Sequence, residues 1–156
     1  MEQDEFDTLI PKAVVVAIRV RKHLDAFREH LYTEENAHKI GYGYKLEHGI
    51  SENAATHLIR DRMYKMGNAL MRQAFVTNLA GDPARFGVFV ELAERVGEQK
   101  VLNEKPLWDA VKNKDYWALH HAFLTSPLLS AYGVGVEGRR RVSYLSRVLV
   151  EGEAAI

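Results

Sequence analysis

A short run with two glycines, Ile40-Gly41-Tyr42-Gly43-Tyr44, is the feature that most constrains the fold of this chain. The residues on both sides of the run show the apolar spacing of helices, whereas the run itself combines glycines with β-prone residues. It therefore predicts a small β region within a mainly helical chain, in the α+β class. Segments of this kind often carry functional residues, so candidate site residues are sought around the run.

Charge and composition exclude several functional classes. The chain has 156 residues, with 21 Lys and Arg against 21 Asp and Glu, so its net charge of zero offers no overall attraction to nucleic acid or anionic membranes. It has no cysteine, which excludes disulfides and thiolate metal sites. The length predicts one domain over 1–156. The acidic start, 1–7, and the absence of a long apolar stretch predict neither a secretory signal nor stable membrane insertion.

Local patterns predict a series of helices around the β region. Apolar residues at helical spacing predict one long helix over 8–31. Ser51 is a good N-cap for a second helix, which we expect to continue to about Leu79. Asp82, followed by a proline, predicts the start of a third helix that stops at Gly97. Further helical segments are predicted at 106–111, 115–124 and 138–150.

Charged and aromatic side chains gather just before the glycine run. On the predicted helix, Asp25, Arg28 and Tyr32 share one face, so Arg28 can neutralise or orient the Asp25 carboxylate. Glu34 and Glu35 follow just beyond the expected end of that helix. Acid-base cleavage of a glycosidic bond requires two carboxyl groups, one protonated and one ionised. On spacing alone, however, solvated surface charges or helix caps explain these acidic residues better.

The wider sequence adds a more specific pattern. The spacing Asp25-x-x-Arg28-x-x-x-Tyr32-x-Glu34 is followed by Lys39-Ile40-Gly41-Tyr42-Gly43-Tyr44 and by a capped helix that starts at Ile50-Ser51. This order resembles the phage-type lysozymes, glycoside hydrolase family 24, whose motif reads Glu, Arg, Tyr, Asp, then Thr-Ile-Gly-Tyr-Gly-His, then Ile-Thr and a capped helix. The resemblance covers most of 24–150, and the glycine run with its following helix is the specific part.

The resemblance implies a fold and an activity. The expected fold is lysozyme-like, α+β and mainly helical, with a small β-lobe at about 33–50 and helical parts at 8–32 and 51–150, joined by a long helix. The expected activity is that of a peptidoglycan hydrolase, a muramidase that cleaves the β-1,4 glycosidic bond after N-acetylmuramic acid. No cofactor or metal ion is expected.

The resemblance also assigns roles to single residues, and most of these residues differ from the family's pattern. The family's general-acid glutamate falls on Asp25, which is one methylene shorter. Its catalytic aspartate falls on Glu34 with the upstream spacing or near Thr33 with the downstream spacing; Glu34 is preferred, with Glu35 as the reserve. The threonine that positions the attacking water falls on Lys39, and the family's histidine falls on Tyr44. The expected substrate-binding residues are Arg28, Tyr32, Glu35, Gly41, Gly43, Tyr44, Glu91, Arg95, Arg139 and Arg140.

Several side chains have alternative interpretations. Lys39 either keeps a nearby carboxylate ionised, which suits a base or nucleophile, or extends from its strand into water. Trp108 and Trp117 are predicted to pack in the core rather than to bind sugar rings. At least one of the pair His120-His121 is predicted to be a hydrogen-bonded packing residue. The histidines near the glycine run match no compact metal motif.

Three functions from different classes remain compatible with the sequence. The first is an active muramidase, with Asp25 as general acid, Glu34 as second carboxylate, and Arg28 with Arg139–Arg141 holding the acid in place. The second is a lysozyme-like protein that has lost hydrolysis and serves as a wall-binding or virion structural component. The substitutions at Asp25, Lys39 and Tyr44 favour it. The third is an unrelated helical interaction domain.

Partners and location follow from the resemblance as expectations. The expected partners are peptidoglycan glycan strands, and virion proteins through the N-terminal extension, with no nucleic acid. A phage endolysin without its own export signal stays in the host cytoplasm until a holin releases it to the periplasm. A virion-borne enzyme is instead carried in the particle.

Overall fold

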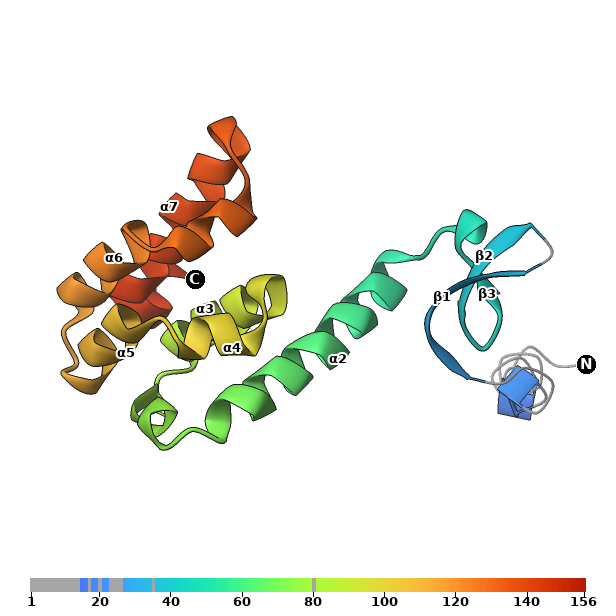
Figure 1. The fold of residues 1–156 in the computed structure, drawn as a ribbon, viewed down its shortest axis with the longest axis horizontal. Coiled ribbons are helices and arrows are strands. Elements are labelled where there is room, and N and C mark those ends of the chain that lie inside the picture. The colour runs from blue at the N-terminus through green and yellow to red at the C-terminus, as the bar shows by residue number, and fades with distance from the viewer. Residues whose placement is uncertain (1–14, 17, 20, 23–26, 35, 80) are drawn as a thin grey trace, which may run out of the picture. The chain divides into compact units, whose positions relative to one another are not determined.

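The computed structural model describes residues 15–16, 18–19, 21–22, 27–34, 36–79 and 81–156. The described chain is mainly helical and contains a small three-stranded antiparallel sheet (Figure 1). It divides into two compact units, Met1–Ala55 and Thr56–Ile156. The helical content and the sheet agree with the α+β, mainly helical class predicted from the sequence.

The first unit is built on the sheet, whose strands β1 (Arg28–Glu34), β2 (Ala37–Gly41) and β3 (Tyr44–Lys45) lie in sequence order. The connection between β1 and β2 is short, because Glu34 pairs directly with Ala37. Asn36 lies in this turn with φ 59°, a left-handed conformation that asparagine tolerates better than most residues. The turn therefore suits its sequence.

The second turn is formed by the glycine run. Ile40 pairs with Tyr44, which leaves Gly41–Gly43 to reverse the chain between β2 and β3. Gly41 has φ 65° and Gly43 has φ 74°, and glycine adopts this region at no steric cost. The β region predicted from the glycine run is confirmed.

The predicted helix over 8–31 is wrong at its C-terminal end. The residues from Arg28 onward form β1 instead of continuing a helix, so the sheet starts earlier than the predicted β-lobe at 33–50. The turn at Asn36 brings β1 against β2, and strand pairing then outweighs the helical spacing of the apolar residues. Of the described residues before β1, 15–16, 18–19 and 21–22 are helical, as predicted.

A short 3-10 helix, η1 (Leu46–His48), leads from the sheet to α2 (Glu52–Met71). Ser51 caps α2 as predicted, since its Oγ accepts a hydrogen bond from the Ala54 backbone N–H at 3.1 Å. The predicted end of this helix at Leu79 is wrong. The chain leaves α-helical geometry after Met71 and forms the 3-10 helix η2 (Ala74–Leu79).

The remaining chain is helical, and its boundaries follow local signals. Asp82 caps α3 (Pro83–Val96), because its Oδ1 accepts from the Arg85 N–H at 3.1 Å, and Gly97 ends the helix with φ 90°. Both ends of this helix were predicted. The elements that follow are α4 (Glu98–Leu102), α5 (Lys105–Lys112), α6 (Tyr116–Leu124), η3 (Pro127–Tyr132), α7 (Gly135–Glu151) and η4 (Gly152–Ala155).

The second unit has a continuous apolar core. Phe89 of α3 packs against Trp108 of α5 with ring centroids 4.5 Å apart, and the Trp108 indole N–H donates to the Val101 carbonyl at 2.8 Å. The predicted core position of Trp108 is therefore confirmed. The same prediction for Trp117 is wrong, because that side chain is 71% exposed on α6. Buried Leu119 faces away from it, since residues two apart on a helix point in nearly opposite directions.

His120 has the packing role predicted for the histidine pair. Its Nδ1 lies 2.6 Å from the Ser146 hydroxyl of α7, and Ser146 is buried. This hydrogen bond joins α6 to α7. Among the described residues, no helix has both the length and the apolar character needed to cross a membrane.

Candidate functional site

The predicted site residues fall in both units. Asp25 and Glu35 lie outside the described residues, so the predicted general acid and the reserve carboxylate have no structural account. The first unit contains the described residues Arg28, Tyr32, Glu34, Lys39, Gly41, Gly43 and Tyr44, and the second contains Glu91, Arg95, Arg139 and Arg140.

Glu34 and Lys39 form an ion pair on the sheet. Lys39 is directly opposite Tyr32, and Glu34 lies two residues further along β1, so the register places both charged side chains on one face. The Lys39 ammonium is 3.2 Å from Glu34 Oε2. The Glu34 side chain is 53% exposed, whereas the Lys39 side chain is only 10% exposed.

The burial of Lys39 excludes one of its two interpretations. The interpretation in which Lys39 extends into water is wrong, because the residue is buried and its ammonium contacts a carboxylate. The contact puts the Lys39 ammonium against the carboxylate that the resemblance assigns as the second catalytic group.

Arg28 and Tyr32 meet on β1 and not on a helix. The Arg28 guanidinium carbon lies 4.2 Å from the centroid of the Tyr32 ring, a cation-π contact. The predicted helical face that joins these residues to Asp25 is wrong, because both lie in a strand.

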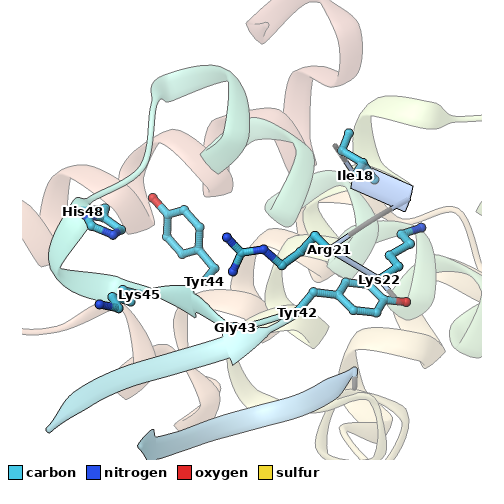
Figure 2. A pocket seen from close by; sticks show the side chains of 8 residues that line it. All are labelled: Ile18, Arg21, Lys22, Tyr42, Gly43, Tyr44, Lys45 and His48. Atoms are coloured by element: carbon cyan, nitrogen blue, oxygen red, sulfur yellow. The ribbon is translucent and has the colours of Figure 1, made fainter. Parts of the chain in front are cut away.

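A pocket of about 560 Å³ opens beside the second turn of the sheet, within the first unit. It is lined on one side by helical residues that precede the sheet and on the other by the β2–β3 turn and η1 (Figure 2). Gly43 and Tyr44 are the predicted site residues that line it. The other lining residues were not predicted as site residues, and they are Ile18, Arg21, Lys22, Tyr42, Lys45 and His48.

Part of the pocket was detectable in the sequence. Ile18, Arg21 and Lys22 are spaced three and four residues apart, so they share one face of a helix. The basic residues on this face were a signal for an anion site. That these residues and Lys45 line the same pocket depends on how the chain folds back, and the spacing of residues in the sequence does not predict it.

Glu91 and Arg95 are bound to each other and to Tyr132. Arg95 Nε donates to Glu91 Oε1 at 2.5 Å, the Tyr132 hydroxyl donates to Glu91 Oε2, and the Arg95 guanidinium lies 4.8 Å from the Tyr132 ring centroid. Burial, and then the hydrogen bond to Glu91, raise the pKa of Tyr132. The hydrogen bond to Glu91 raises the pKa of Arg95. The three side chains join α3 to η3.

The basic run near the start of α7 makes contacts within its own unit. Arg140 pairs with Glu137 one turn earlier at 3.1 Å, and both side chains are mostly exposed. Arg141 donates to the Tyr132 carbonyl at 3.0 Å, and Arg139 is exposed. Among the described residues, no group of three His, Cys, Asp or Glu side chains is placed to hold a metal ion.

No protein-family model, curated protein or solved structure matches this chain. The resemblance to the phage-type lysozymes, and the roles that it assigns to Asp25, Glu34 and Lys39, therefore stay predictions.

Proposed function

We propose that the protein is a muramidase that binds peptidoglycan glycan strands and cleaves the β-1,4 bond after N-acetylmuramic acid. The observation that carries the proposal is the ion pair between Glu34 and Lys39 at the end of the β1–β2 hairpin. Glu34, which the resemblance assigns as the second catalytic group, is half-exposed and contacts a buried cation, which supports this role. The nearby glycine turn and the Ser51 cap of α2 supply the most specific part of the lysozyme pattern.

The proposed reaction uses two carboxyl groups in opposite protonation states. Asp25 donates a proton to the glycosidic oxygen as the bond from that oxygen to the anomeric carbon breaks. Glu34, which contacts the Lys39 ammonium, either attacks the anomeric carbon or removes a proton from the water that does so. If Glu34 attacks, water then displaces it from the anomeric carbon and gives a proton to Asp25. If Glu34 removes a proton from water, the hydroxyl goes to the anomeric carbon, Glu34 releases that proton to the solvent, and Asp25 takes up a proton from the solvent.

A second candidate function is glycan binding without hydrolysis, in a wall-binding or virion structural component. The contacts of Glu91 and Arg95 favour the structural role in particular, because these predicted substrate-binding side chains contact each other and Tyr132. The shorter acid at Asp25 favours it too, since a misplacement of about 1 Å can cost roughly 100-fold in rate.

Dye release from labelled, purified peptidoglycan tests the first function directly. We expect the wild type to release dye, and Asp25→Ala and Glu34→Gln each to reduce the rate by roughly 100-fold or more, because each loses one of the two catalytic groups. Glu29→Gln is the matched control, since Glu29 is an exposed carboxylate on the same strand as Glu34. Its rate should equal that of the wild type.

Pelleting with insoluble peptidoglycan separates the two functions. A wild type that pellets but releases no dye, and gains dye release in Asp25→Glu, supports the second function over the first. A protein that neither pellets nor releases dye contradicts both. Detection of the protein in purified phage particles would assign it to the virion, and its absence there would favour lysis after release by a holin.

A further inference from the structure

We infer that the pocket beside the β2–β3 turn binds a small acidic ligand, a carboxylate or phosphate group attached to a sugar ring. The pocket has a volume of about 560 Å³, which lies within the range of sites for small organic ligands, roughly 300 to 1,000 Å³. It shares Gly43 and Tyr44 with the predicted glycan site, but the inference does not rest on hydrolysis.

The charge of the lining residues favours a negatively charged ligand. Arg21, Lys22 and Lys45 bring cationic side chains that only donate hydrogen bonds, and His48 adds a ring nitrogen that can donate one. Among the described residues that line the pocket, none is a carboxylate. An anion therefore finds charge-assisted donors there, which are stronger than neutral hydrogen bonds.

The sheet register gives an independent reason to expect an anion. Lys45 is directly opposite Lys39, and like charges at such a pair destabilise a sheet. The charge of Lys39 is compensated by Glu34, whereas half-buried Lys45 has no ion-pair partner among the described residues. Glu47, the nearest acidic residue in sequence, is exposed on η1 and does not line the pocket. A bound anion would offset the repulsion at Lys45.

The aromatic residues favour a ligand with a ring. Tyr44 is 42% exposed, and Figure 2 shows Arg21 extending from the helical side toward it. Lys22 lies 5.4 Å from the Tyr42 ring centroid, so the second tyrosine helps to place one of the cations. A sugar ring can pack its apolar face on Tyr44 while its acidic substituent contacts the cations.

An NMR titration of the full-length protein tests the inference with three sugars of similar size. N-acetylmuramic acid carries a carboxylate, N-acetylglucosamine 6-phosphate carries a phosphate, and N-acetylglucosamine is neutral. We expect at least one acidic sugar to shift the amide resonances of Gly43–His48, with binding that weakens as salt is added. The neutral sugar should bind at least about tenfold more weakly, since it lacks the charge-assisted contacts.

Variants of Lys45 identify the pocket as the site. Lys45→Gln should weaken binding of the acidic sugar roughly tenfold, because one charged contact is lost. Lys45→Arg, which keeps the charge, should bind like the wild type. Lys100→Gln is the matched control, since Lys100 is exposed on α4 in the other unit.

Equal binding of the neutral sugar, unchanged binding by Lys45→Gln, or no shift with any of the three sugars overturns the inference. Preference between the two acidic sugars tells whether the ligand is a carboxylated wall sugar or a phosphorylated one. Binding of acidic sugars by a protein that releases no dye from peptidoglycan supports the pocket and contradicts only the muramidase function.

Discussion

The second unit buries residues from every one of its α-helices, whereas the described part of the first unit buries only Ala37, Lys39 and Gly43. The second unit is therefore held together mainly by removal of apolar surface from water. The described part of the first unit depends on strand pairing, two tight turns and the Glu34–Lys39 ion pair. The pocket and the proposed catalytic carboxylate therefore lie where packing contributes least. Binding regions are often drawn from such less stable parts of a protein.

The sharpest test of this comparison is native-state hydrogen exchange. We expect the openings that expose amides of β1 and β2 to cost at least about 3 kcal/mol less free energy than the openings that expose amides of α3 and α7. The reason is the contrast between the sheet and the apolar core around Phe89 and Leu149. Exchange followed by NMR or mass spectrometry would check it. Equal protection in the two units would show that the sheet shares the stability of the core.

The next largest effect is expected at the close approach between α7 and the residue that follows η3. A Cβ added at Gly138 would overlap the Gly133 carbonyl and lie 2.7 Å from its carbon, so Gly138→Ala should lower the free energy of unfolding by about 3 kcal/mol. Gly87→Ala is the control, because a Cβ there meets nothing within 4 Å on α3, and it should stabilise by about 0.5 to 1 kcal/mol. Urea unfolding measures both. A mild loss at Gly138 would mean that α7 can shift away from η3.

Arg85 links the start of α3 to the end of α7. Its guanidinium donates to the Leu149 and Val150 carbonyls at 2.7 Å each and pairs with Asp82 at 2.6 Å. The last carbonyls of a helix lack partners within the helix, so Arg85→Met should destabilise the second unit by about 2 kcal/mol. Arg139→Met, at an exposed position of α7, should stay within about 0.5 kcal/mol of the wild type. Thermal unfolding that ranks the two variants equally would contradict this role.

Tyr132 makes the stability of the second unit depend on pH. Loss of its hydroxyl contact to Glu91 in Tyr132→Phe should cost about 1 kcal/mol near pH 8. Because folding raises the pKa of Tyr132, the contribution is complete below the ordinary tyrosine pKa of about 10 and declines above it. The difference in the free energy of unfolding between the wild type and Tyr132→Phe should therefore decrease between pH 10 and 11. Unfolding by urea at several pH values measures it, and Tyr64→Phe, exposed on α2, should show no such trend.

The smallest effect is expected at the ion pair of the first unit. A double-mutant cycle with Glu34→Gln and Lys39→Met should give a coupling of about 0.5 kcal/mol, since Glu34 is half-exposed and solvent screens the pair. The Glu137–Arg140 pair of α7, in which both side chains are mostly exposed, should give less. For the Glu34–Lys39 cycle, the free energy of opening is measured in each variant from the hydrogen exchange of the β1 and β2 amides. Equal couplings would mean that the burial of Lys39 adds nothing to its attraction for Glu34.

Features that depend on a few neighbouring residues could be predicted from the sequence. Ser51 and Asp82 cap helices because their side-chain oxygens reach backbone N–H groups three residues ahead. Gly41 and Gly43 reverse the chain because glycine alone adopts positive φ without strain. The mainly helical class and the place of the sheet followed from such local signals. The candidate carboxylate Glu34 came from the motif around the glycine run.

Features that depend on residues far apart in the chain, or on competition between a helix and a strand, could not be predicted from local patterns. Pairing with β2 made a strand of the residues that begin at Arg28, despite their helical spacing. The same pairing placed Lys39 against Glu34 and brought Lys45 to a pocket whose other wall precedes the sheet. Arg85 reaches the end of α7, 64 residues further along the chain, and no local pattern indicates that contact. Local signals set which backbone conformations are favourable, whereas burial and pairing decide which of them the folded chain keeps.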